Sequence, residues 1–177
     1  MRRKLEKYCM KKELISLYAD IENTDKFLTG YINSVDDFGV VVNHITPYGT
    51  YDGYVYISID DIFCLETHSK YIEKIKKLME KNYQENHKKL EIDNNQSLFM
   101  NYLIFAKKNH MLISWQICGE QYAMSTGFIE EIENEIIKIS KITEFGEKDG
   151  ETFVKLDCIN SCQCDTTDEQ LLMELLK

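Results

Sequence analysis

The sequence contains one proline, Pro47, and no apolar run near the length of about 18 residues that a membrane-spanning helix needs. It has no glycine-rich phosphate loop, and its four histidines are scattered without a Ser-His-Asp or Cys-His arrangement. The basic start, Arg2-Arg3-Lys4, is not followed by a long apolar stretch, so we expect no secretory signal. These absences favour a cytoplasmic, non-enzymatic protein with no membrane partner and no proline-rich linker.

Charge is distributed unevenly along the chain. The net charge is −9, from 21 basic and 30 acidic residues. Residues 1–90 hold 14 of each kind, whereas residues 91–177 hold 7 basic and 16 acidic residues. An acidic surface repels the phosphate backbone, so broad nucleic-acid binding is disfavoured. The lysines of residues 74–89 alternate with glutamates, which indicates a solvated helix face.

The two parts of the chain are similar to each other. Residues 29–78 align with residues 126–175 at a constant shift of 97, with 11 identities in 50 positions, where chance would give about 3. The identities include glycines and aspartates as well as apolar residues: Gly30/Gly127, Gly49/Gly146, Asp52-Gly53/Asp149-Gly150 and Asp60/Asp157. We therefore interpret the chain as an internal duplication, with a first repeat at residues 1–90 and a second at residues 91–177.

Each repeat is predicted to contain a helix, five strands and a closing helix. Helical spacing indicates helices near residues 2–12, 69–87, 97–107 and 168–176. β-Branched and alternating runs indicate strands near residues 13–20, 26–35, 40–45, 54–59 and 62–66, and near 111–117, 122–132, 136–142, 152–156 and 159–164. The two Asp-Gly pairs predict hairpin turns, because glycine accepts a positive φ.

This order of elements resembles the Sm-like small barrel, one of the SH3-like barrels. The residues that carry the resemblance are Gly30, Asp36 and residues 56–62 in the first repeat, and Gly127, Glu133 and residues 153–159 in the second. The resemblance implies a mainly β fold with α (α+β), as two tandem five-stranded barrels, each with an N-terminal and a C-terminal helix. The first repeat also resembles uncharacterised bacterial proteins with a "DD" turn and a "YDGY" hairpin, a likeness that implies no activity.

The resemblance also implies a place for a ligand. Sm-like proteins usually form rings and bind single-stranded RNA, through an asparagine in the loop between strands 2 and 3 and basic or polar groups between strands 4 and 5. Here the first loop holds Asp37 and Phe38, and the second turn holds Asp60-Asp61, whose carboxylates repel phosphate. Asn134 in the second repeat retains part of the family pattern. Asp37, Phe38 and Asn134 are therefore candidate binding residues.

Tyrosines form a second candidate binding surface. Tyr48, Tyr51 and Tyr54 cluster near one hairpin of the first repeat, where aromatic rings can stack on a base or a partner. Tyr56 is expected to face the core, because Phe153 stands at the aligned position.

Cysteines are the remaining candidate for chemistry. Cys158, Cys162 and Cys164 form a C-x3-C-x-C run, with Cys118 a possible neighbour, and thiolates two or four residues apart share a strand face. The run has no C-x2-C pair, and no histidine follows at zinc-finger spacing. Buried thiols are the favoured interpretation, and we expect no metal and no cofactor.

The leading hypothesis is a non-enzymatic binding and assembly module. Small barrels have edge strands that can pair edge to edge within the chain or between chains, so we expect self-association or a protein partner. Two alternatives stay open. One is RNA or single-stranded nucleic-acid binding by the first repeat, and the other is a small enzyme with a site between the repeats.

Overall fold

The two parts of the chain, here called the first half (residues 1–90) and the second half (residues 91–177), contain the same succession of elements. The computed structural model describes residues 1–82, 88–117 and 125–176. The first half contains α1 (Arg2–Lys11), β1 (Leu14–Tyr18), β2 (Leu28–Val35), β3 (Gly39–Ile45), β4 (Tyr51–Ser58), the 3-10 turn η1 (Ile59–Asp61), β5 (Cys64–Thr67) and α2 (Lys70–Asn82). The second half contains α3 (Leu98–Lys108), β6 (Ile113–Ile117), β7 (Ser125–Glu133), β8 (Ile136–Ile142), β9 (Lys148–Lys155), η2 (Leu156–Cys158), β10 (Ile159–Cys164) and α4 (Thr167–Leu175).

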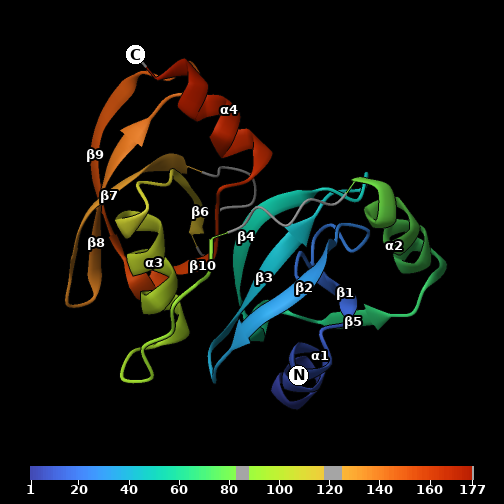
Figure 1. Ribbon diagram of the computed structural model, residues 1–177. Helices are drawn as coiled ribbons and strands as arrows, with labels where there is room; N and C mark the ends of the chain where they lie inside the picture. Colours follow the sequence, from blue (N-terminus) through green and yellow to red (C-terminus); the bar gives the residue numbers. More distant parts are fainter. Residues whose placement is uncertain (83–87, 118–124, 177) are drawn as a thin grey trace.

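The ten strands form one antiparallel sheet that runs through both halves (Figure 1). Its order is β5-β1-β2-β3-β4-β10-β6-β7-β8-β9, and the sheet is open, with β5 and β9 as its outer strands. The predicted α+β class is confirmed. The expected arrangement of two closed barrels is not confirmed, because the sheet stays open and residues 54–57 of β4 pair with residues 161–164 of β10 to continue it from one half into the other.

The hydrophobic core also crosses the boundary between the halves. The largest cluster of buried side chains joins Val41, Tyr54 and Tyr56 of the first half to Leu103 and Trp115 of the second. Helix α3 contributes much of this cluster and contacts both β3 and β7. Two halves that share a core lose apolar contact if they separate, at about 25 cal/mol for each Å² exposed. The boundary is therefore a packed joint.

Strand β3 shows why a continuous β-branched run suits this position. Val40, Val41 and Val42 are all completely buried. Successive side chains of a strand point to opposite faces, and here Val41 belongs to the core shared by the halves while Val40 and Val42 belong to the core of the first half. Strand β8 alternates instead, with Ile137 and Ile139 buried and Lys138 between them partly exposed.

The Asp-Gly pairs do not form the hairpin turns, so this prediction was wrong. Asp52-Gly53 lies inside β4, and the turn before it is closed by the Thr46 N–H, which donates to the Thr50 carbonyl at 2.9 Å. Gly49 in that turn has a φ of 79°. Gly53 nevertheless has a φ of 75°, and a β-carbon there would stand 2.4 Å from the Cys164 carbonyl oxygen. Its glycine is needed for the close approach of β10.

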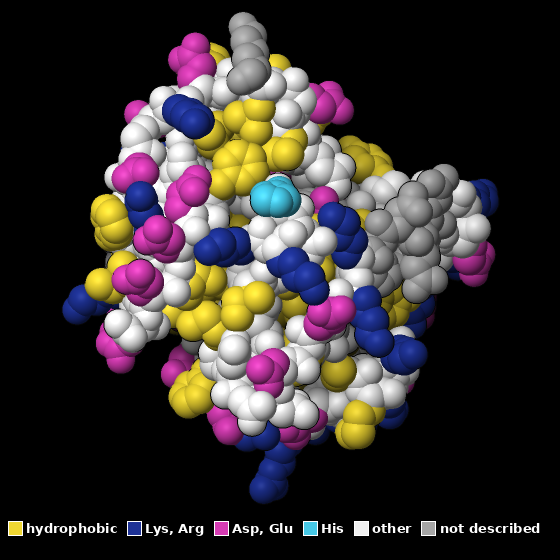
Figure 2. All heavy atoms as spheres, turned by 60° about the vertical axis from the view of Figure 1, so that its left-hand side comes forward, with side chains coloured by type: hydrophobic (Ala, Val, Ile, Leu, Met, Phe, Trp, Pro, Cys, Tyr) yellow, Lys and Arg dark blue, Asp and Glu magenta, His cyan; other side chains and the backbone are white. Residues whose placement is uncertain are grey.

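Within the described residues, no helix combines the length and the apolar character that crossing a bilayer requires. The surface is mixed in character. Figure 2, which brings the left-hand side of Figure 1 forward, shows hydrophobic, basic and acidic side chains side by side on that face.

Candidate functional site

The three candidate tyrosines do not share a surface. Tyr48 is 74% exposed in the β3–β4 turn, Tyr51 is half-buried and Tyr54 is fully buried. The Tyr54 hydroxyl donates to the Lys88 carbonyl, and its ring meets Phe105 edge-on with centroids 5.0 Å apart. As predicted, Tyr56 faces the core. A stacking surface that needs Tyr54 is therefore not available.

The candidate residues from the Sm-like resemblance lie at two separate turns. Phe38 is 73% exposed in the β2–β3 turn, and the neighbouring Asp37 forms an ion pair with Arg2. Asn134 lies in the β7–β8 turn with a φ of 50°. The two turns lie apart in Figure 1. The structure thus places these residues on the surface but does not bring Asn134 together with Asp37 and Phe38.

The cysteines do not form a metal centre among the described residues. Cys162 and Cys164 are fully buried in the shared core, and Cys158 is partly exposed in η2. Burial raises the pKa of Cys164 and Cys162 well above that of an ordinary thiol, which disfavours the thiolate that zinc requires. Cys118 falls outside the described residues.

The joint between β4 and β10 is held by side chains as well as by strand pairing. The Tyr102 hydroxyl of α3 lies 3.3 Å from the Tyr54 carbonyl oxygen and 3.2 Å from the Cys162 carbonyl oxygen, so it bridges the two strands. The Tyr56 ring stacks on Phe99 with centroids 4.4 Å apart.

Asp52 of β4 forms hydrogen bonds across the same joint, next to the paired residues 54–57. Its Oδ1 accepts hydrogen bonds of 2.7 Å from both the N–H and the hydroxyl of Thr167, the first residue of α4. Its Oδ2 lies 3.0 Å from His44 Nδ1. Burial alone would raise the pKa of Asp52, but the hydrogen bonds from His44 and Thr167 outweigh it and lower the pKa to about 2. The carboxylate thus stabilises the start of α4 from the opposite half.

A cleft of 560 Å³ opens beside this joint. Both halves line it, with residues of β1, β4 and the β1–β2 loop on one side and residues of β6 and β10 on the other. Asp61 of η1 and Asn160 of β10 meet there, because the Asn160 amide donates to the Asp61 carboxyl group.

The two outer strands, β5 and β9, are the other candidate site. Within the described residues, each pairs with a strand on one side only, β5 with β1 and β9 with β8. Phe153 of β9 is 67% exposed. An outer strand offers unpaired N–H and carbonyl groups along its free side, and such a side accepts a further strand.

Comparison with family models, with curated proteins and with solved structures finds no significant match. The site must therefore be interpreted from its own geometry. Sequence reasoning missed the role of Asp52, which it assigned to a turn. The identity of Asp52 and Asp149 across the two repeats was the available signal, because a carboxylate retained at the same place suggests a shared hydrogen-bonding role.

Proposed function

We propose that the protein is a non-enzymatic assembly module, built from two Sm-like units that arose by duplication and that join through their edge strands. The five strands of each half have matching orders, β5-β1-β2-β3-β4 and β10-β6-β7-β8-β9. Non-glycine residues with positive φ also occur at matching places. His68 and Asp165 have φ values of 58° and 60°, and Lys12 and His110 have values of 50° and 52°.

The pairing of β4 with β10 is the observation that carries the proposal. At the shift of 97, residues 54–57 of β4 correspond to residues 151–154 of β9, and residues 161–164 of β10 correspond to residues 64–67. Residues 64–67 are the whole of β5. By the same correspondence, β9 of one chain would pair with β5 of a second chain, as β4 pairs with β10 inside the chain. Phe153 would then lie opposite Leu65, and Glu151 opposite Thr67.

Space at the outer edge supports the same arrangement. A β-carbon at Gly53 would collide with backbone atoms of Cys164, Asp165 and Thr166, whereas a β-carbon at Gly150 would meet no atom of the described residues within 4 Å. Yet Gly150 has a similar φ of 77°. The segment that corresponds to residues 164–166 is residues 67–69, at the end of β5. A second copy of the chain would fill the space beside Gly150.

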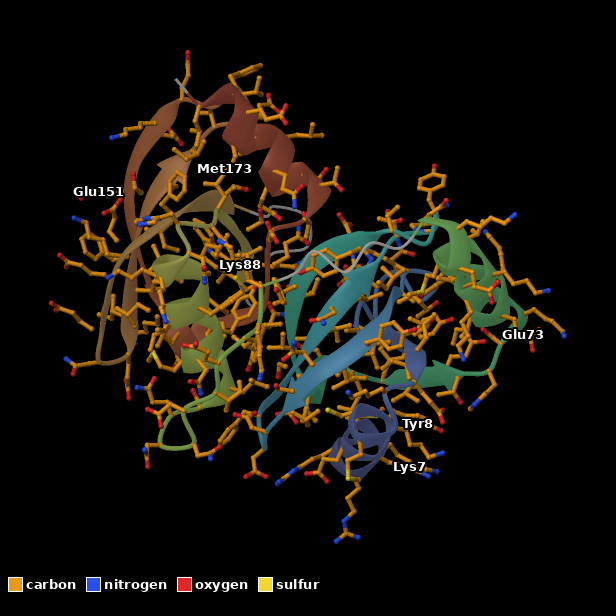
Figure 3. All side chains as sticks on the ribbon, viewed as in Figure 1. Lys7, Tyr8, Glu73, Lys88, Glu151 and Met173 are labelled. Atoms are coloured by element: carbon orange, nitrogen blue, oxygen red, sulfur yellow. The ribbon has the colours of Figure 1, made fainter. Side chains whose placement is uncertain are left out.

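The geometry favours head-to-tail assembly. Strands β5 and β9 lie at opposite sides of the molecule in Figure 1, and Glu151 of β9 and Glu73 of α2 lie on opposite sides in Figure 3. Different surfaces on the two partners give a heterologous contact, which closes into a ring or continues as a filament.

Cross-linking tests the register. One chain carries Thr67→Cys, the other Glu151→Cys, and both carry Cys64→Ser, because Cys64 is exposed. Directly opposed β-carbons lie about 4.5–5.5 Å apart, close enough for a disulfide after small adjustments. We expect a disulfide between the mixed chains on mild oxidation.

Lys155→Cys replaces Glu151→Cys in the matched control, since Lys155 is also exposed on β9. We expect little cross-linking there. A protein that stays monomeric by light scattering at all concentrations, without register-specific cross-linking, contradicts the proposal.

A further inference from the structure

The cleft between the halves has the volume and the partly apolar lining of a small-molecule site. Its volume of 560 Å³ falls in the range of about 300–1,000 Å³ usual for such sites. Leu17, Val55 and Ile57 line it and pack within the core of the first half, which makes this part of the wall rigid and apolar. A ligand with an apolar body would bury its methylene groups here.

Carboxylates outnumber basic groups around the cleft. Among the residues that the structure describes, the charged lining consists of Asp20, Glu22, Asp52, Asp61 and Asp168 against Lys26 and His44. Both basic groups already have acidic partners, since His44 pairs with Asp52 and Lys26 lies 3.8 Å from Asp20. When a cleft has mainly one sign of charge and low-dielectric walls, the electric field is concentrated inside it. Such a cleft attracts ligands of the opposite charge. The complementary ligand is a cation.

Asn160 adds a directional feature. Its amide group donates to Asp61, while its Oδ1 is buried and accepts no hydrogen bond from the residues that the structure describes. Burial and the charge of Asp60 raise the pKa of Asp61, although the hydrogen bond from Asn160 opposes this. The Asn160 amide thus fixes the Asp61 carboxyl group at the wall of the cleft, where a ligand that supplies N–H groups can donate to it. An ammonium group has three such donors and no acceptor.

We propose that this cleft binds a linear polyamine, in which ammonium groups alternate with short methylene chains. One ammonium group donates to the Asp61 carboxylate, which the Asn160 amide holds in place. The adjoining methylene groups cover Val55 and Ile57, and a further ammonium group meets the acidic residues Asp20, Glu22 and Asp168. This binding involves neither outer strand, so it is independent of assembly.

Calorimetric titration of the full chain with spermidine at low salt tests the proposal. We expect saturable binding of one spermidine per chain that weakens as salt is added. Asp61→Asn should weaken it about tenfold or more, because a charge-assisted hydrogen bond is lost. Asp60→Asn is the matched control: it changes the net charge equally, but Asp60 is exposed and its effect should stay within about twofold.

A second variant and two further ligands separate the site from general acidity. Asn160→Leu removes the amide that donates to Asp61 and should also lower the affinity. Octane-1,8-diol, a neutral chain, and Mg²⁺, a cation without methylene groups, should bind far more weakly than spermidine. The proposal is overturned if spermidine does not saturate at millimolar concentration, if Asp60→Asn and Asp61→Asn weaken binding equally, or if either comparison ligand binds as tightly.

Discussion

Strands β4 and β9 are each the fourth strand of a half, yet their surroundings differ. On β4, Tyr54 and Tyr56 are 0% and 5% exposed and belong to the shared core. On β9, the aligned residues are Glu151, which is exposed, and Phe153, which is 67% exposed. Of these two strands, β4 has a neighbour on each side, β3 and β10, whereas β9 pairs only with β8 among the described residues. What covers a strand, and not its place in the unit, decides which side chains it buries.

The two halves also hold their final helices differently. Ile72 of α2 is completely buried among apolar side chains, while at the aligned position of α4 stands Glu169, which is 2% exposed. The Glu169 carboxylate accepts from the Ser114 hydroxyl, from the Gln163 amide and from the Thr166 N–H. A buried carboxylate is tolerated when donors surround it. The second half thus replaces an apolar contact with a polar network.

Tyr56→Ala and Phe153→Ala should give the largest difference between the strands. Removing the buried Tyr56 ring should cost about 3–5 kcal/mol of unfolding free energy through lost contacts and a cavity. Removing the exposed Phe153 ring should change it by no more than about 0.5 kcal/mol. Urea unfolding of the two variants, at a concentration where the protein is monomeric, measures both. Similar losses would show that β9 is covered in solution.

Gly53→Ala and Gly150→Ala test the space beside the two strands. Both glycines have positive φ, which costs an alanine about 1–2 kcal/mol. Gly53→Ala also drives a β-carbon into the Cys164 carbonyl, so its total loss should reach about 2–4 kcal/mol. The matched pair differs only in this collision, and the comparison again uses urea unfolding of the monomer. Equal losses would contradict a tight β4–β10 contact.

Asp52→Asn and Asp149→Asn compare the two retained aspartates as pH changes. The pKa of Asp52 in the folded protein is about 2, below its ordinary value of 3.8. A lowered pKa stabilises the fold fully above the unfolded value, and the contribution is lost as pH falls through the folded one. We expect Asp52→Asn to cost about 2 kcal/mol at pH 7, and the gap to wild type to narrow between about pH 4 and pH 2.

The control is Asp149→Asn, since Asp149 forms an exposed ion pair of 2.8 Å with Lys141. Its loss should stay below about 1 kcal/mol. Unfolding curves recorded across this pH range provide the measurement. A gap for Asp52→Asn that does not narrow in acid would show that the hydrogen bonds to His44 and Thr167 do not lower its pKa.

Local pattern was enough to predict most elements of the fold. The run Val40–Val42 and the alternation around Ile137 and Ile139 predicted β3 and β8, because β-branched residues suit a pleated, half-buried surface. Edge-to-edge joining within the chain was expected as one possibility, but the choice of β4 and β10 could not be predicted, since they lie about 100 residues apart and no local signal specifies their pairing. The burial of Tyr54, the role of Asp52 and the cleft all depend on that pairing.

Thr29→Val and Thr126→Val should show the smallest difference, at a hydroxyl pair that both halves contain. Ser16 and Thr29 lie 2.8 Å apart, and Ser114 and Thr126 lie 2.9 Å apart. Thr29→Val leaves the buried Ser16 hydroxyl without this bond, for a loss of about 1 kcal/mol. Ser114 also donates to Glu169, so Thr126→Val should cost less than about 0.5 kcal/mol. Thr126→Val is then repeated in the Glu169→Gln background. If its cost in unfolding free energy rises toward that of Thr29→Val, the Glu169 carboxylate is what compensates for the lost Ser114–Thr126 hydrogen bond. An unchanged cost would mean that the network around Glu169 does not couple to this pair.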